Sequence, residues 1–214
     1  MAQRVRTTPR KRPRQDRSKA TVDAILAATA QVLVKDGYDR TSTNRVAERA
    51  GVSVGSVYQY FPNKEALVGE LVDRYSREIL DLLLGELATL ASHPPEIVAP
   101  RLVATMVRIK QQDPLLARVL REQIPRVGRM QRYEKQLGEI VAAVAAYLDG
   151  HRARLRHDDV EVAAFIAVHT VDAATHAGVC AGELDADTLT RHVTDLALAY
   201  LLREPQAAQR RVKV

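Results

Sequence analysis

The sequence predicts an all-α protein of about nine helices, three of them in an N-terminal head. The chain of 214 residues has no Trp and few helix breakers, with 10 Gly and 9 Pro, while the good helix formers Ala and Leu are abundant. Apolar residues recur at three- and four-residue steps through most of the chain. At this length one domain or two are both possible, and the chain can bury an ample core.

The first helix is expected over about residues 19–35. Five residues at helical spacing would face inward, and Gly37 would stop the helix. The five are Val22, Ile25, Leu26, Thr29 and Leu33.

Two short helices joined by a glycine turn are expected within residues 41–64. Gly51 supplies the left-handed backbone that ends a helix sharply, and Val52 is expected to be the buried plug of the turn. Ser53 is a good N-cap for the second helix. Val57 and Phe61 lie four residues apart and should face inward.

The remaining helices are delimited by caps and prolines. They are expected at about residues 63–90, 96–112 (or from Pro100), 113–123, 129–156, 158–181 and 187–203. Residues 93–95, His-Pro-Pro, are expected to interrupt the helical structure between the first two of these helices. Asp158 with Glu161 resembles a capping box, and Asp187 should open the last helix. In the helix at 63–90 the inward side chains are expected to be Leu67, Leu71, Ile79, Leu82 and Leu83.

The positive charge is concentrated at the N-terminus. Residues 1–19 carry a net charge of +7 and the whole chain +6, so the other 195 residues carry −1. With two prolines and almost no apolar residues, this arm should be disordered when free. It either places arginines in a DNA minor groove or adds only salt-dependent attraction as a solvated tail.

The single cysteine, Cys180, excludes an internal disulfide framework and fits a reducing cytoplasm. No apolar run is expected to reach the ~18–20 residues of a membrane span, and no secretory segment follows Met1. We therefore expect no membrane partner.

The polar and aromatic outer face of the second short helix is typical of a helix that lies in a DNA major groove. Gly55 in its first turn is otherwise a poor choice, disfavoured by roughly 0.8–1 kcal/mol against Ala in a helix interior. A close approach of the backbone to DNA would explain it. Lys64, at the start of the next helix, is placed to meet a phosphate. The alternative is a plain helical hairpin.

Residues 21–71 closely resemble the DNA-binding domain of the TetR family of transcriptional regulators. The matching features are Gly37-Tyr38, Thr41-Ser42, Val46-Ala47, Ala50-Gly51-Val52-Ser53, Gly55, Tyr58, Tyr60-Phe61 and Lys64-Glu65. The resemblance implies a cytoplasmic, nucleoid-associated regulator that binds a double-stranded DNA operator. It also implies an unknown small-molecule effector and a homodimer formed through about residues 158–181 and 187–203. The expected domains are a disordered basic arm (1–18), a helix-turn-helix DNA-binding head (19–65), a ligand-binding and dimerisation body (66–204) and a disordered tail (205–214).

The resemblance further implies which residues meet DNA. Thr43 matches a phosphate contact, Asn44 a base reader able to pair with adenine, and Tyr58 a contact at the groove edge. The full set is Ser42, Thr43, Asn44, Val54, Gly55, Ser56, Tyr58, Gln59, Tyr60 and Lys64, with Arg10, Lys11, Arg12 and Arg14 in the arm.

The body gives weaker signals. His169, Asp172, His176 and Cys180 recur at steps of three and four, so they share one helix face. They line a ligand pocket, form a polar structural seam, or ligate a metal. Candidate ligand-binding residues are Met106, Arg121, Tyr133, Phe165, His169, Asp172 and His176. We expect no cofactor and no metal.

Together these patterns favour a ligand-released repressor. One alternative is a DNA-binding architectural or partner-recruiting protein without a ligand. Another is a small all-helical enzyme using His169, Asp172 and His176, although the chain has no nucleophile elbow or phosphate-binding loop.

Overall fold

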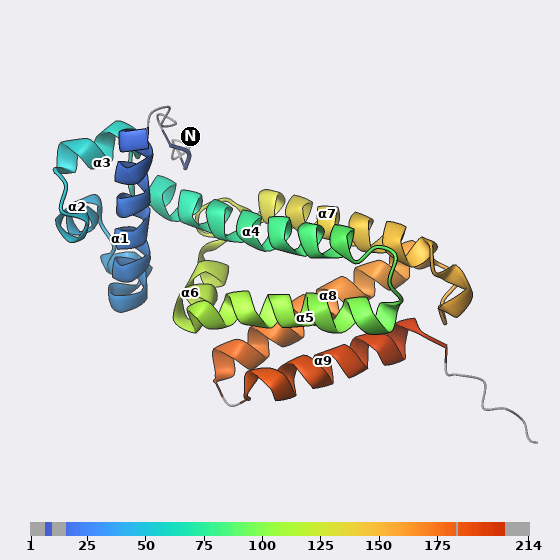
Figure 1. The fold of residues 1–214 in the computed structure, drawn as a ribbon. Helices are drawn as coiled ribbons and strands as arrows, with labels where there is room; N and C mark the ends of the chain where they lie inside the picture. The colour runs from blue at the N-terminus through green and yellow to red at the C-terminus, as the bar shows by residue number, and fades with distance from the viewer. Residues whose placement is uncertain (1–6, 10–15, 183, 204–214) are drawn as a thin grey trace, which may run out of the picture. The chain divides into compact units, whose positions relative to one another are not determined.

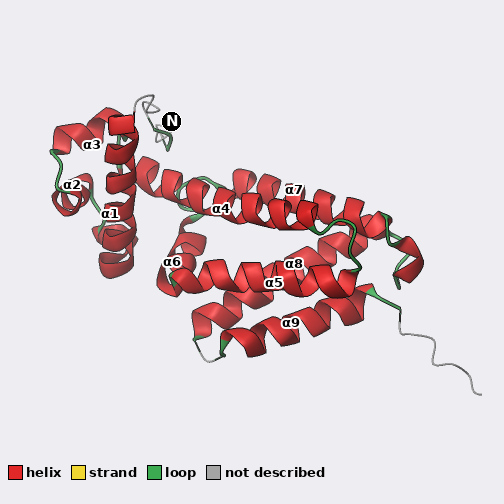
Figure 2. Ribbon diagram, in the orientation of Figure 1, coloured by secondary structure: helices red, strands yellow, loops and turns green. Residues whose placement is uncertain are grey.

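A computed structural model describes residues 7–9, 16–182 and 184–203. Within them the chain is helical, as Figures 1 and 2 show, and the all-α prediction is confirmed. The α-helices are α1 (Asp16–Arg40), α2 (Thr43–Ala50), α3 (Val54–Tyr60), α4 (Lys64–Thr89), α5 (Pro95–Gln112), α6 (Pro114–Gln123), α7 (Met130–Asp149), α8 (Val160–Ala181) and α9 (Ala186–Leu201), with a 3₁₀ turn at Arg152–Arg154.

The chain divides into two compact units. The first comprises Met1–Leu82 and Ile109–Gly138, and the second Leu83–Arg108 and Glu139–Val214. The division therefore runs through α4, α5 and α7. The first unit is therefore larger than the DNA-binding head that was predicted to end at residue 65, because α6 packs on α1 within it.

The core of the first unit is built on α1. Ile25, Val46 and Val57 are fully buried where α1, α2 and α3 meet, and Phe61 and Leu67 close the same cluster. A neighbouring cluster joins α4 and α6 through Leu33, Val68, Val72, Leu120, Ile124 and Val127. The three head helices are thus held by apolar packing on their inner faces, which leaves the outer faces of α2 and α3 free.

The predicted N-cap at Ser53 and the predicted helix stop at Gly51 are confirmed, and Ser42 caps α2 in the same way. The Ser42 hydroxyl accepts from the amide of Arg45, and the Ser53 hydroxyl accepts from the amide of Ser56. Gly51 ends α2 in the left-handed conformation with φ 67° and ψ 30°. Val52, predicted to be a buried plug, is only partly buried.

The second unit is organised around the pair α8 and α9, which lie side by side. Leu155, Ala164 and Leu201 are buried in one cluster of this unit, and Val107, Val179 and Val193 in another. Gly178 permits the close approach of α8 to α9, since a methyl group at this position would lie 2.5 Å from Cδ1 of Leu189.

Several predicted boundaries are wrong. The N-cap of α8 is Asp159 rather than Asp158, and that of α9 is Asp185 rather than Asp187, because these are the carboxylates that accept from amides three residues ahead. The helix α1 begins at Asp16 rather than at about residue 19. Its predicted stop at Gly37 is confirmed, because that residue has a non-helical backbone with φ 77° and only one further turn, to Arg40, follows it. Further along the chain, α7 ends at Asp149, before the 3₁₀ turn.

One predicted inward side chain is also misplaced. Leu82 is 42% exposed, whereas its neighbour Leu83 is buried. Adjacent residues on a helix point about 100° apart, so both cannot face the same side.

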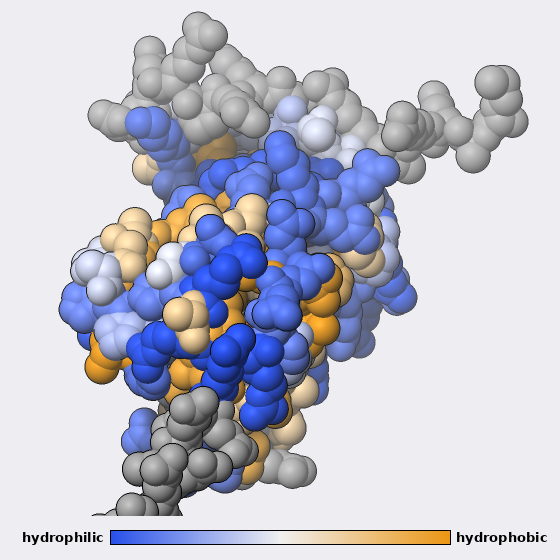
Figure 3. All heavy atoms as spheres, turned by 90° about the vertical axis from the view of Figure 1, so that its right-hand side faces the viewer, coloured by the Kyte–Doolittle hydropathy of each residue, from blue (hydrophilic) through white to orange (hydrophobic). Residues whose placement is uncertain are grey.

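The expectation that no segment is long and apolar enough for a membrane span is wrong for α8. Its 22 residues pass that test by length and composition, with 28% of the apolar window buried. The core helix of a globular protein passes the same test, and α8 carries the buried Asp172 and Thr175. On the face drawn in Figure 3, hydrophilic side chains separate the hydrophobic patches.

Candidate nucleic-acid interface

The turn between α2 and α3 sets the direction of the outer face of α3. After Gly51 reverses the chain, the amide of Val52 donates to the carbonyl of Ala47 at 3.1 Å, which ties the turn to α2. Val57 and Phe61 then enter the core. Because both anchors lie on one side of this short helix, its other side faces solvent.

The predicted DNA-contacting residues divide by exposure. Those exposed are Asn44, Val54, Gly55, Tyr58 and Gln59, while Ser42, Ser56, Tyr60 and Lys64 are half-buried and Thr43 is buried. All belong to α2, α3, their caps or the first residue of α4. The structure therefore gathers them in the first unit, mostly on two adjoining helices.

Thr43 supports Tyr58. Its hydroxyl donates to the phenolic oxygen of Tyr58 at 3.1 Å, and its side chain is buried while the tyrosine is 41% exposed. This bond links the first turn of α2 to the outer face of α3. Thr43 therefore holds a tyrosine ring in place, a role that the sequence did not indicate.

The Lys64 ammonium already has partners within the chain. It donates to the carbonyls of Tyr38 at 3.2 Å and Asp39 at 3.4 Å, and it lies 4.5 Å from the centroid of the Tyr38 ring. The phenol of Tyr38 faces Glu65 at 3.5 Å, and burial is the main cause that raises the pKa of Tyr38 above its usual value. Lys64 thus joins the start of α4 to the end of α1.

Nothing inside the described protein requires glycine at position 55. A methyl group there would meet only the Ser53 hydroxyl oxygen, at an ordinary contact distance of 3.7 Å. Its φ is not positive, in contrast to Gly51. The fold of the described residues therefore gives no reason for glycine at position 55, which lies on the exposed side of α3.

The predicted arm residues Arg10, Lys11, Arg12 and Arg14 lie outside the described residues. Two further arginines on α2 were not predicted. Arg45 pairs with Asp36 at 2.8 Å and Arg49 donates to Gln31, so both brace α2 against α1.

The predicted ligand-binding residues are distributed over both units. Arg121 and Tyr133 belong to the first unit, with the guanidinium 6.0 Å from the tyrosine ring centroid. The others belong to the second unit, where Met106 and Asp172 are buried and Phe165 is 53% exposed. His169 stacks on Phe165 with ring centroids 4.0 Å apart. Among the described residues, no group of three or more His, Cys, Asp or Glu side chains could hold a metal ion.

The second unit contains an open surface cavity of about 510 Å³ between the last turns of α4 and α7. It is lined by Leu84, Leu87, Ala88, Ala91, Ser92, Ala143, Ala146, Tyr147, Gly150 and His151. The Tyr147 hydroxyl donates to the carbonyl of His93 at 2.8 Å. Burial, followed by the charge of Glu96, raises the pKa of Tyr147 to about 12, so the phenol stays protonated.

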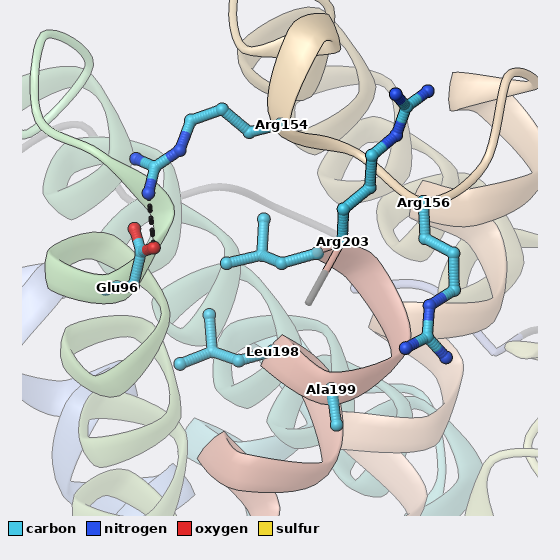
Figure 4. A pocket seen from close by; sticks show the side chains of 7 residues that line it. Glu96, Arg154, Arg156, Leu198, Ala199 and Arg203 are labelled. Carbon is cyan, nitrogen blue, oxygen red and sulfur yellow. Dashed lines mark hydrogen bonds and ion pairs between the residues drawn. The ribbon is translucent and has the colours of Figure 1, made fainter. Parts of the chain in front are cut away.

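A second cavity, of about 410 Å³, lies beside the bridge between Leu155 and Leu202. Figure 4 shows Arg154 turned toward Glu96, with which it pairs, while the guanidinium groups of Arg156 and Arg203 extend in other directions. The three cations therefore do not converge on one point. None of the seven predicted ligand-binding residues lines either cavity.

These features define a helix-turn-helix DNA-binding protein, and comparison with known proteins identifies the family. The model for bacterial regulatory proteins of the tetR family matches residues 25–71, and that for the tetracyclin repressor-like C-terminal domain matches residues 94–201. The chain belongs to the TetR family of transcriptional regulators, which confirms the resemblance.

Similarity to individual proteins supports the same family. The chain is 27% identical over 187 residues to the DNA-binding transcriptional repressor TetR of Mycobacteroides abscessus, covering 83% of this chain and 92% of that protein. It is 36% identical over 97 residues to the repressor KstR of Mycolicibacterium smegmatis, covering 45% of this chain and 46% of KstR. A TetR-family regulator from Mesorhizobium loti shares the fold, with a TM-score of 0.69, 21% identity and coverage of 88% and 100%.

The protein is thus a DNA-binding transcriptional regulator. Regulators of this family bind DNA operators and small-molecule effectors, typically as dimers.

Replacing Gly55 by Ala should separate folding from DNA binding. We expect Gly55→Ala to raise the free energy of unfolding by up to about 1 kcal/mol, because Ala favours the helix, and to weaken DNA binding by blocking close approach of the backbone. Urea unfolding and fluorescence anisotropy with labelled DNA would measure the two effects. The control is Gly85→Ala in α4, where a methyl group meets nothing within 4 Å. Gly85→Ala should leave DNA binding unchanged; equal affinity for both variants would contradict a DNA-facing role for Gly55.

Proposed function

We propose that this chain is a homodimeric, ligand-released repressor that binds a palindromic operator through α2 and α3. The observation that carries the proposal is the exposed outer face of α3, with a glycine at position 55 that the folded chain does not require. Since one helix-turn-helix makes few base contacts, two copies on adjacent half-sites are expected.

Base reading in this proposal depends on few side chains. Asn44 is exposed at the start of α2, and its amide can pair with adenine through two hydrogen bonds. Gln59 is exposed on α3 and long enough to reach a base edge. Val54 offers only apolar contact, suited to a thymine methyl. The hydroxyls of Ser42, Ser56 and Tyr60 suit phosphate oxygens, which position the protein without reading sequence.

Selection of bound fragments from genomic DNA would test this assignment. The wild-type chain should select an inverted repeat. Asn44→Ala should relax the preference at one position of each half-site and cost about 1–3 kcal/mol there. Arg45→Ala serves as the matched variant, because Arg45 is exposed beside Asn44 but pairs with Asp36; it should leave the selected sequence unchanged. An unaltered preference in the Asn44 variant would remove this residue from the readers.

The dimer interface in this proposal is the outer face of α8 with part of α9. Val162, Phe165 and Ile166 are exposed large apolar side chains at helical spacing on α8, and Leu196 is exposed on α9. An apolar stripe of this kind on a single copy of a chain is typical of a protein–protein contact. It agrees with the low buried share of α8.

A charge placed in this stripe should dissociate the dimer. We expect Phe165→Glu to shift the chain from dimer to monomer and to weaken operator binding, because a buried unpaired carboxylate is costly. Multi-angle light scattering and analytical ultracentrifugation would measure the mass. Leu115→Glu is the control, since Leu115 is 52% exposed on α6, close to the 53% of Phe165. A dimeric Phe165 variant, or equal dissociation by both, would contradict the assignment.

The cavity between α4 and α7 is the candidate effector site. Its volume of about 510 Å³ and mostly apolar lining suit a small, largely apolar molecule, with the Tyr147 hydroxyl and the His151 ring as polar partners. The helix α4 runs from Lys64, beside the head, to Thr89, in this cavity's unit. A ligand that binds one pose of α4 more tightly than another shifts the population of the DNA-binding pose.

Filling the cavity should abolish binding of an apolar probe. Ala146 lines the cavity, and Ala142 is also exposed one helical turn earlier on α7 but does not line it. We expect Ala146→Trp, but not Ala142→Trp, to weaken binding of anilinonaphthalene sulfonate, measured by its fluorescence. The probe should also lower operator affinity of the wild-type chain. Equal probe binding by the two variants would show that this cavity is not the site.

An enzymatic role for His169, Asp172 and His176 has less support. His169 is engaged with Phe165, its Nδ1 lying 2.8 Å from that residue's carbonyl oxygen. The relatives are regulators, which implies a non-enzymatic protein.

A further inference from the structure

Thr7 in the N-terminal arm is held by Arg129, which lies 122 residues further along the chain in the same unit. The guanidinium of Arg129 donates from Nη1 to the Thr7 hydroxyl at 3.0 Å and from Nη2 to the Thr7 carbonyl. Its Nε donates to Oδ2 of Asp73 at 3.0 Å. Arg129 and Asp73 are both buried, and all three guanidinium nitrogens are used.

The local structure fixes Arg129 before it meets the arm. Gly128 has a left-handed backbone with φ 65°, and the following amide, that of Arg129, donates to the carbonyl of Ile124 at 2.9 Å. Val127 in the same turn is fully buried against α4. The guanidinium therefore rests on a turn that is packed into the core.

Gly69 provides the space for this contact. A methyl group there would lie 2.8 Å from Nη2 of Arg129 and 3.1 Å from the carbonyl oxygen of Thr7. Gly69 lies inside α4 without a positive φ, so its backbone does not require glycine. The niche of Gly69, Asp73 and Arg129 thus explains a residue that is otherwise unfavourable within a helix.

The excess positive charge in this niche favours an oxygen acceptor such as a backbone carbonyl. Asp73 accepts from both Arg129 and Arg132, each at 3.0 Å. Burial raises the pKa of Asp73, and the two arginines oppose that rise. One carboxylate beside two guanidinium groups leaves an excess of positive charge, which the Thr7 carbonyl and hydroxyl oxygens face.

We propose that Gly69, Asp73 and Arg129 form a clamp that positions the basic arm for DNA binding, with Arg129 as a positioning residue. The inference rests on the proposed DNA-binding role of the head. Pro9 and Asp16 stand on either side of residues 10–15, and both belong to the first unit. A stretch of this length spans at most about 3.3–3.6 Å per residue. Fixing Thr7 as well as α1 therefore keeps the charge of the arm near the head and raises its effective concentration at DNA.

The clamp itself can be tested without DNA. A dye on Thr8→Cys, in a chain with Cys180→Ser, reports motion beside Thr7 through its fluorescence anisotropy. We expect Gly69→Ala to lower this anisotropy, while Gly85→Ala in the same helix leaves it unchanged. Should Gly69→Ala fail to fold, Arg129→Lys keeps the charge but loses the fork of donors and should lower the anisotropy as well. Unchanged anisotropy in the folded variant would overturn the clamp.

DNA binding then separates a positioning role from a structural one. We expect Gly69→Ala to raise the Kd for DNA on the order of tenfold and to flatten its salt dependence. The same substitution should have no effect in a chain that lacks residues 1–9. An equal loss with and without these residues would show that Gly69 acts through the fold and would overturn the inference. A wild-type chain that binds no DNA would instead contradict the proposed function.

Discussion

The left-handed backbone at Gly51 is the constraint on which the head depends. It ends α2, and the amides of Gly51 and Val52 return to the carbonyls of Glu48 and Ala47. A residue with a Cβ would be disfavoured there by roughly 1–2 kcal/mol. Because the chain reverses at this point, Val57 and Phe61 reach the core built on α1. The polar side of α3 is left in water as a consequence, and that side is the DNA-reading surface we propose.

Several side chains assigned to DNA are first of all part of the fold. The Lys64 ammonium rests on two carbonyls and the Tyr38 ring, and Thr43 holds the hydroxyl of Tyr58. Such bonds fix side chains before a partner arrives, so less conformational entropy is lost on binding. The same logic extends to the arm, whose Thr7 is held against α4 by Arg129. The DNA-binding surface that we propose is thereby organised by contacts from α1, α4 and the turn before α7.

The parts of the fold that were predictable are those set by neighbours in sequence. The caps at Ser42, Ser53 and Asp113 each accept from an amide three residues ahead, so the residue type and its position suffice. Where two acidic residues compete, as at Asp158 and Asp159, the choice depends on how the chain enters the helix, and the prediction missed by one residue. The ends of the long helix α4 were predicted to within one residue, but Leu82 on this helix was predicted to face inward and is exposed.

By itself the sequence determined the class of protein, because a glycine turn, its caps and the apolar spacing act within a few residues of one another. It also located the basic arm, since charge can be counted along the chain. Only the tertiary structure decided which residues the body brings together. Helical spacing tells which residues share a face but not what that face meets. Phe165, predicted to line a ligand site, is 53% exposed on α8, whereas residues that were not predicted line the open cavity beside α7. Likewise Arg129 meets Thr7 from 122 residues away, a separation over which only packing of the whole unit can choose the partner.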